Sequence, residues 1–299
     1  MALLARPRPS TVLRHPASTR LVIPCAGARL IYRGRPLIMG VLNVTPDSFS
    51  DGGKFVDPEA AIRHGLQLAA DGADLLDIGG ESTRPDARSV STEEELRRVI
   101  PVVRHLAKRA RIPISIDTSK AEVAARAIGA GVVIVNDVTA LRGDPQMPAV
   151  VARSRVAVIL MHMRGSPQTM QCHPRYTDVV ADIAAFLRDA ATRAEEAGIE
   201  RSRILLDPGL GFGKTVRHSL TVMRELDRFV SLGYPVVIGP SRKSFIGRTL
   251  QADVDDRLAG TLACVASAQR CGAHIVRVHD VRPAVHLIRM LDAIEHAPT

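Results

Sequence analysis

The chain repeats one pattern eight times: a short apolar run, a polar loop and a segment with helical periodicity. In the first repeat, a continuous apolar run starts at Leu37 and turns polar at Asn43, and Pro46 and Gly52-Gly53 then mark a loop. Continuous apolar runs are typical of strands buried on both faces of a parallel sheet. The eight predicted strands span residues 37–42, 73–78, 112–116, 132–135, 156–161, 204–206, 236–238 and 274–278.

Eight strand–helix units with short connections predict a closed (β/α)8 TIM barrel, because right-handed crossovers leave few other arrangements. The alternative is a doubly wound open sheet. Such a sheet typically has a Gly-x-Gly-x-x-Gly turn after its first strand, and the sequence has no such turn there. Residues 21–31 hold two short apolar runs around Gly27, which predict a small hairpin before the barrel. We therefore expect one barrel domain over residues 21–299. Among its helices we expect 216–232 after the sixth strand and 253–270 after the seventh.

The net charge of +9 is concentrated at the N-terminus, where residues 1–36 hold seven arginines and no acidic residue. The rest of the chain holds 33 of the 40 basic residues and all 31 acidic ones. This near balance argues against a nucleic-acid partner. Residues 1–20 are rich in Arg, Pro, Ser and Thr without periodicity, so they predict a disordered basic tail. A transit peptide is the alternative, but Pro7, Pro9 and Pro16 oppose an amphipathic helix.

The apolar runs and the cysteines predict the cellular location of the protein. No run reaches the roughly 18 apolar residues of a membrane-spanning helix, so we expect no membrane partner. The four cysteines, Cys25, Cys172, Cys264 and Cys271, form no Cys-x-x-Cys pair and show no metal-site spacing. Cysteines without a disulfide framework fit the reducing cytoplasm.

Polar residues gather at the carboxyl ends of the predicted strands, where barrel active sites lie. They are Asn43, Asp77, Asp117, Asn136, Asp207, Lys243, Arg277 and His279. One polar strand end is ordinary, but so many at one rim are hard to explain as solvated loops. The residues therefore predict an enzyme site at this end of the barrel.

Arg277 and His279 lie two apart on the last strand, so their side chains face the same way. Beside Lys243-Ser244 from the seventh strand, they predict a cationic cluster of the kind that holds phosphate groups in barrels. The alternative is that Arg277 pairs structurally with Asp280. The chemistry of the cluster favours an anionic, phosphorylated ligand.

Asp117, Asn136 and Asp207 predict a set of hydrogen-bond acceptors across the barrel mouth. Acceptors in an apolar mouth suit a flat heterocycle with several N–H donors. The alternative for the two aspartates is helix capping, since both precede predicted helices. His162 taken alone is more typical of a core histidine. From the residues alone, the substrate is a donor-rich heterocycle with an anionic group, and the reaction stays open.

Seven stretches resemble the dihydropteroate synthase family from about residue 21 to the C-terminus. They are Met39-Gly-Val-Leu-Asn-Val-Thr-Pro-Asp-Ser-Phe-Ser-Asp-Gly-Gly53, Asp77-Ile-Gly-Gly-Glu-Ser-Thr-Arg-Pro85, Ser115-Ile-Asp-Thr-Ser119, Asn136-Asp-Val138, Leu206-Asp-Pro-Gly-Leu-Gly-Phe-Gly213, Ser241-Arg-Lys-Ser244 and Arg277-Val-His-Asp280. The family has the same barrel fold. It joins 4-aminobenzoate to 6-hydroxymethyl-7,8-dihydropterin diphosphate and releases pyrophosphate in folate synthesis.

The resemblance assigns roles to the rim. It implies that the pterin is held by Asp117, Asn136, Asp207 and Lys243. It implies that the pyrophosphate is held with Mg²⁺ by Arg277, His279 and Asn43, of which Asn43 contacts the metal. It implies an aminobenzoate pocket shaped by Phe49, Ser82, Thr83, Arg84 and Pro85, with Ser244 beside Lys243 among the substrate contacts. Asp117, Lys243, Arg277 and His279 would be the catalytic residues, and we expect a cytoplasmic homodimer.

Asp86 departs from the family pattern, which usually has glycine after Arg-Pro in the second loop. Aspartate tolerates φ > 0 better than most residues, so the loop can still close, with altered geometry and charge. Two rival readings stay open. A pterin-binding methyltransferase shares the barrel but releases no anion, against which Lys243, Arg277 and His279 argue. An inactive pterin-binding paralogue is the other.

Overall fold

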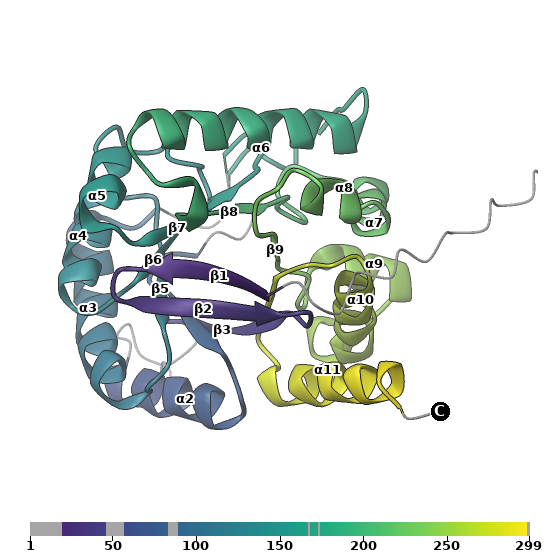
Figure 1. Cartoon of the computed structure of the whole chain (residues 1–299), viewed down its shortest axis with the longest axis horizontal. Coiled ribbons are helices and arrows are strands. Elements are labelled where there is room, and N and C mark those ends of the chain that lie inside the picture. The colour runs from purple at the N-terminus through teal and green to yellow at the C-terminus, as the bar shows by residue number, and fades with distance from the viewer. Residues whose placement is uncertain (1–19, 46–56, 83–88, 167, 173, 298–299) are drawn as a thin grey trace, which may run out of the picture.

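Eight parallel strands form the centre of the molecule (Figure 1). The computed structural model describes residues 20–45, 57–82, 89–166, 168–172 and 174–297. The barrel strands are β3 (Leu37–Asn43), β4 (Leu75–Gly79), β5 (Ile114–Asp117), β6 (Ile134–Asp137), β7 (Ala157–Met161), β8 (Ile204–Asp207), β9 (Val237–Ile238) and β10 (Ile275–Val278). They pair in the order β8-β7-β6-β5-β4-β3-β10-β9, and a parallel bridge between Leu206 and Val236 joins the two ends. The predicted barrel is confirmed.

Helices surround the strands. They are α2 (Pro58–Ala70), α3 (Thr92–Arg109), α4 (Ala121–Gly129), α5 (Met147–Ser154), α6 (Val179–Glu196), α7 (Val216–Arg224), α8 (Asp227–Val230), α9 (Ser244–Leu250), α10 (Leu258–Arg270) and α11 (Val281–Glu295). Local signals start several of them: the Ser91 hydroxyl accepts from the Glu94 backbone N–H at the start of α3. No helix among the described residues has the length and apolar character needed to cross a membrane.

Two predicted helices are wrong in detail. The segment 216–232 is split into α7 and α8, because the backbone leaves the helical region at Glu225 (φ −110°, ψ 30°). The segment 253–270 begins late: residues 254–256 form a 3-10 turn, and α10 starts at Leu258. The additional helix α9 has only seven residues and no side-chain cap, so the sequence carries no strong signal for it.

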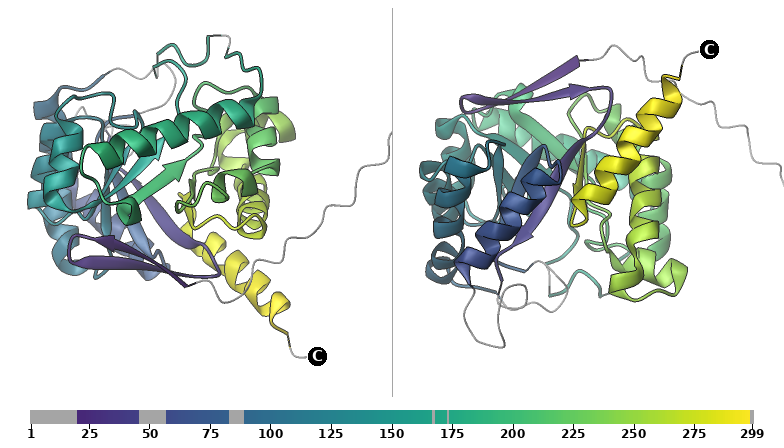
Figure 2. Two further views of the ribbon diagram at one scale, coloured as in Figure 1. Left: turned by 45° about the horizontal axis from the view of Figure 1, so that its top comes forward. Right: turned by 90° about the horizontal axis from the view of Figure 1, so that it is seen from below.

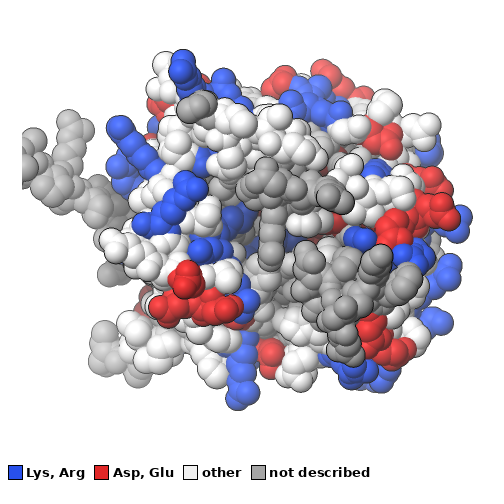
Figure 3. All heavy atoms as spheres, turned by 180° about the vertical axis from the view of Figure 1, so that it is seen from behind, with Lys and Arg blue, Asp and Glu red and all other residues white. Residues whose placement is uncertain are grey.

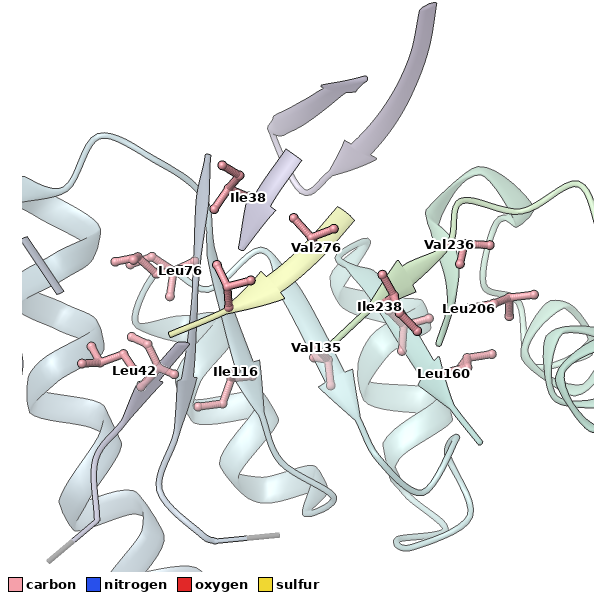
Figure 4. Close-up of a cluster of buried hydrophobic side chains, with 14 of the residues drawn as sticks. Ile38, Leu42, Leu76, Ile116, Val135, Leu160, Leu206, Val236, Ile238 and Val276 are labelled. Carbon is pink, nitrogen blue, oxygen red and sulfur yellow. The ribbon is translucent and has the colours of Figure 1, made fainter. Parts of the chain in front are cut away.

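Alternation along each strand separates the barrel interior from the layer beneath the helices. Outward side chains such as Ile38, Leu76 and Val276 pack against the surrounding helices (Figure 4). Inward ones such as Met39 and Leu75 belong to a separate buried cluster inside the barrel. The polar residues at the strand ends continue the inward set, which brings them to the barrel mouth.

The N-terminal hairpin, β1 (Arg20–Cys25) and β2 (Ala28–Arg33), is also confirmed. Ile23, Cys25 and Leu30 pack onto the inward residues at the amino ends of the strands. The hairpin therefore covers one end of the barrel and leaves the loops at the other end (Figure 2). Arg20 already belongs to β1, so the predicted tail is one residue too long; its residues 1–19 lie outside the described residues.

Candidate active site

The strand register brings three predicted positions and a glycine side by side at the barrel mouth. Asn43 pairs with Gly79, Gly79 with Asp117, and Asp117 with Asn136, on four adjacent strands. A Cβ on Gly79 would lie 3.8 Å from Asn43 Oδ1 and 3.9 Å from Asp117 Oδ2, so these two oxygens flank a space that glycine keeps open. On this face, opposite the hairpin, basic and acidic side chains are interspersed around the rim (Figure 3).

Asp77 lies at the centre of the polar network, a role that the sequence did not reveal. Its carboxylate is fully buried, and Oδ2 accepts from Arg277 Nε at 2.6 Å and from Asn136 Nδ2 at 2.9 Å. Its Oδ1 is buried without a hydrogen-bond partner among the described residues. Because Asn136 donates its amide N–H₂ to Asp77, its carbonyl oxygen stays available as an acceptor.

Arg277 joins the two sides of the mouth that were predicted to face each other. Its Nε donates to Asp77 Oδ2, and its Nη2 donates to Asp117 Oδ2 at 3.0 Å. The guanidinium is about 21% exposed, whereas the two carboxylates are 0% and 11% exposed. The predicted cationic cluster is thus tied directly to the acceptor set by ion pairs.

The two alternative structural roles predicted from the sequence, an Arg277–Asp280 pair and helix capping by the two aspartates, are both wrong. Asp280 pairs with Arg242, whose Nε and Nη2 reach it at 3.0 and 2.6 Å, and Arg277 does not take part. Neither aspartate caps a helix: the N-cap residue of α4 is Lys120 and that of α7 is Thr215. Asp117 and Asp207 therefore have no helix-capping role that would account for them.

The two carboxylates at the mouth are harder to ionise than ordinary aspartates. Burial raises the pKa of Asp117 to about 7, although the Arg277 guanidinium opposes the rise. Burial also raises the pKa of Asp207, against the Gly209 backbone N–H that donates to Oδ1 at 2.7 Å and against nearby Lys243. Such shifts are typical of groups that bind or exchange protons with a ligand.

Lys243 contributes a cation on the opposite wall. Its ammonium donates to the Leu210 carbonyl at 2.7 Å and lies 4.1 Å from the centre of the Phe212 ring. Burial lowers the pKa of Lys243 to about 8, with Asp207 opposing the fall. The loop after β8 therefore holds Lys243, which itself follows β9.

His279 and Ser244 lie at the neighbouring strand ends. The Ser241 hydroxyl accepts from the His279 backbone N–H at 3.1 Å and lies 3.0 Å from His279 Nδ1, an interaction that the sequence did not suggest. Ser244 is exposed at the first position of α9. Strands β9 and β10 pair, so Lys243 follows one strand, and Arg277 and His279 lie at the end of its neighbour.

The predicted aminobenzoate residues are only partly covered. Ser82 is described and partly buried, whereas Phe49, Thr83, Arg84, Pro85 and the divergent Asp86 lie outside the described residues. Just before Ser82, Glu81 binds the Lys120 ammonium, which also binds the fully buried Glu95. This pair of ion pairs anchors the start of the loop to α3 and α4.

His162 is a buried residue, as expected of a core histidine, but its partner is unusual. Lys214 Nζ lies 2.9 Å from His162 Nδ1, and both side chains are at most 5% exposed. Burial lowers the pKa of His162 to about 2, and the nearby Lys214 charge adds to this, so the imidazole is neutral. This contact could not be predicted from the sequence, because the two residues are 52 positions apart.

Comparison with known proteins decides the family. A model of the pterin binding enzymes matches residues 39–279. The chain is 44% identical over 281 residues to dihydropteroate synthase of Bacillus subtilis, covering 94% of this chain and 96% of that protein. The chain belongs to the dihydropteroate synthase family. Its counterpart in Escherichia coli is 45% identical over 258 residues, 86% of this chain and 91% of that protein.

Solved dihydropteroate synthases share the fold closely. The structure of the Xanthomonas albilineans enzyme with 4-aminobenzoic acid matches with a TM-score of 0.88 and 47% identity, over 94% of this chain and 100% of that one. The same enzyme in complex with 7,8-dihydropteroate matches with a TM-score of 0.82 and 45% identity, over 93% and 100%. The dihydropteroate synthase family consists of transferases, and this chain is one of them.

Proposed function

We infer that the chain condenses 6-hydroxymethyl-7,8-dihydropterin diphosphate with 4-aminobenzoate to give 7,8-dihydropteroate and pyrophosphate. The observation that carries this conclusion is the barrel mouth, where buried acceptors and cations adjoin each other in a member of the dihydropteroate synthase family. Relatives solved with 4-aminobenzoic acid and with 7,8-dihydropteroate support the same substrates here.

We propose that Asp207, Asn136 and Asp117 hold the pterin. The ring presents several N–H donors along one edge, and carboxylate and amide oxygens match them. Lys243 closes the opposite side as a donor to ring acceptors. Asp117 is the carboxylate placed to stabilise positive charge on the pterin once the leaving group departs, because its negative form is held by Arg277.

Arg277, His279 and Asn43 are the proposed contacts for the diphosphate. Departure of pyrophosphate is favoured when cations neutralise its growing charge. Arg277 is already bound to Asp77 and Asp117, so it acts on both halves of the site. Of its donors, those outside these two ion pairs are the ones available to phosphate oxygens.

Mg²⁺ fits the residues present at Asn43. The ion takes oxygen ligands and often only one or two from protein, with water and phosphate supplying the rest. Asn43 Oδ1 faces the space that Gly79 keeps open beside Asp117, and no cluster of three acidic, His or Cys ligands occurs among the described residues. When bound, the ion would supply charge neutralisation of the diphosphate.

We place 4-aminobenzoate beside Lys243 and Ser244, under the loop that begins at Ser82. The arylamine is a weak nucleophile, which suits attack on an electrophilic pterin and needs no strong general base. Phe49, Thr83, Arg84 and Pro85 are proposed for this pocket from the resemblance.

A homodimer is proposed through the helices that follow the last three strands. Six exposed large apolar residues lie on α7, α9, α10, α11 and the turn between α9 and α10: Leu220, Leu250, Val254, Leu258, Met290 and Ile294. Met290 and Ile294 are 61% and 60% exposed. We propose that the partner subunit covers exposed apolar side chains on these helices. Light scattering of wild type and Met290→Asp should give a dimer and a monomer; monomeric wild type would contradict the proposal.

A cytoplasmic location is proposed from cysteine chemistry. Cys25, Cys172, Cys264 and Cys271 are all free thiols, two of them partly buried and one fully buried. Unpaired cysteines persist in reducing compartments.

The decisive experiment measures pyrophosphate release from the pterin diphosphate with and without 4-aminobenzoate. We expect release that depends on the arylamine and on added Mg²⁺, and that Asp207→Ala reduces by at least about tenfold, the loss from one hydrogen bond to a charged group. Pterin binding without turnover would indicate the inactive paralogue. Methyl transfer from methyltetrahydrofolate to a corrinoid in place of pyrophosphate release would indicate the methyltransferase.

A further inference from the structure

The loop after β8 carries two groups that contact Lys243. The Leu210 carbonyl accepts from its ammonium, and the Phe212 ring lies against it. Lys243 thus depends for its position on a loop that belongs to a different strand. Since this inference concerns Lys243, it rests on the proposed function.

That loop has an unusual backbone. Gly209, Gly211 and Gly213 all have positive φ, at 68°, 80° and 62°. A Cβ on Gly209 would lie 2.1 Å from the His162 carbonyl oxygen, and one on Gly213 would lie 2.5 Å from that of Arg164. The loop is therefore pressed against the segment that follows β7. A conformation that few residues adopt has to be held by its surroundings.

Lys214 supplies the contacts that hold it. Its ammonium is buried and reaches three acceptors: His162 Nδ1 at 2.9 Å, the His162 carbonyl at 3.4 Å and the Phe212 carbonyl at 3.1 Å. Two of these acceptors belong to the segment after β7 and one to the glycine loop. The neutral imidazole of His162 is able to accept at Nδ1. Tyr176 adds a parallel tie, because its hydroxyl donates to the Gly213 carbonyl at 2.8 Å.

A role in stability alone does not explain why Lys214 is buried against these three acceptors. Burying an ammonium without a carboxylate in direct contact is costly, and an apolar side chain would pack there without that cost. Burial lowers the pKa of Lys214 well below its ordinary value, with nearby Asp207 opposing the fall. The three fixed acceptors point to a geometric role, in which direction matters more than stability.

We propose that Lys214 is a positioning residue for the pterin subsite: it locks the glycine loop onto the β7–α6 segment and so fixes the Leu210 carbonyl and the Phe212 ring that hold Lys243. Lys214 itself touches no substrate in this scheme. Its effect reaches the pterin only through Lys243.

A double-mutant cycle tests this route. Calorimetric titration with 6-hydroxymethylpterin would be carried out on wild type, Lys214→Met, Lys243→Met and the double variant. Methionine keeps most of the length of the lysine side chain, being one heavy atom shorter, and removes all donors. We expect Lys214→Met to weaken binding by about tenfold in the wild-type background, the loss of one hydrogen bond to a charged group. In the Lys243→Met background the same change should cost less than about twofold.

Equal losses in both backgrounds would overturn the proposal, because Lys214 would then act on the pocket without Lys243. No loss in either background would overturn it as well. Wild type that fails to bind the pterin would instead contradict the proposed function. Lys108→Met, at an exposed position of α3, is the matched control and should bind like wild type. Should Lys214→Met fail to fold, Lys214→Gln takes its place with the same outcomes.

Discussion

Lys120 and Lys214 are two lysines beneath the same barrel mouth with opposite surroundings. Lys120 contacts two carboxylates, Glu81 and Glu95. Burial opposes its charge, yet these two partners raise the pKa of Lys120 above its ordinary value. Lys214 contacts only neutral acceptors, and burial lowers its pKa. The contrast separates a lysine that neutralises buried charge from one that directs a backbone.

The two lysines also serve different loops. Lys120 ties the residue before Ser82 to α3, on the side proposed for 4-aminobenzoate. Lys214 ties the glycine loop to the segment after β7, on the side proposed for the pterin. Each lysine links segments that are far apart in the sequence. Lys120 and Glu81 are 39 positions apart, and Lys214 and His162 are 52 positions apart. The electrostatic difference predicts different consequences when each ammonium is removed.

The largest effect is expected at Lys120. Lys120→Met leaves the carboxylate of Glu95, which is 0% exposed, without its counter-ion. Breaking a buried ion pair by removing one partner costs about 3 kcal/mol or more in the free energy of unfolding. Urea denaturation measures this loss, with Lys108→Met as the exposed control, which should stay within about 0.5 kcal/mol of wild type. A Lys120→Met protein as stable as the control would contradict a stabilising role for the Lys120–Glu95 ion pair.

A smaller loss is expected at Lys214. Lys214→Met leaves the His162 and Phe212 carbonyls without this donor, at a cost of about 1–2 kcal/mol. The cost of burying the ammonium disappears at the same time, which offsets part of the loss. The same urea experiment should therefore rank Lys214→Met between Lys120→Met and Lys108→Met. The comparison fails if Lys214→Met is the less stable of the two buried-lysine variants.

The smallest effect is in the pH dependence of stability. A lysine whose pKa is lowered by folding binds more protons when unfolded, so its contribution to stability rises with pH up to the unfolded pKa of about 10.4. A lysine whose pKa is raised contributes fully below that value and loses the contribution only as pH rises through the folded pKa. Between pH 7 and 9, the stability of wild type relative to Lys214→Met should therefore rise, and that relative to Lys120→Met should stay level. Denaturation curves at several pH values would show it, and parallel trends for the two variants would contradict the assigned surroundings.

The sequence by itself determined the barrel and the membership of its mouth. Eight apolar runs with helical segments between them admit few folds, and a parallel sheet places all its carboxyl ends at one edge. Asn43, Asp117, Asn136 and Asp207 could be assigned to that edge because a strand's last residue is recognisable from where apolar character stops. The hairpin was also predictable, because its two short apolar runs and the turn between them are recognisable from the local sequence. The short helix α9 was not, since seven residues without a cap carry little periodicity.

Only the tertiary structure decided which polar groups meet. Arg277 was predicted to oppose the acceptors, but closure of the ring joins it to Asp77 and Asp117, which are 200 and 160 positions away along the chain. Lys214 finds His162 in the same way. The alternation along a strand predicts which face of the sheet a side chain lies on, and the end of the apolar run predicts which end of the barrel it lies at. The choice of partner depends on strand order, register and distances of a few ångströms across the barrel, and those exist only once the ring has closed.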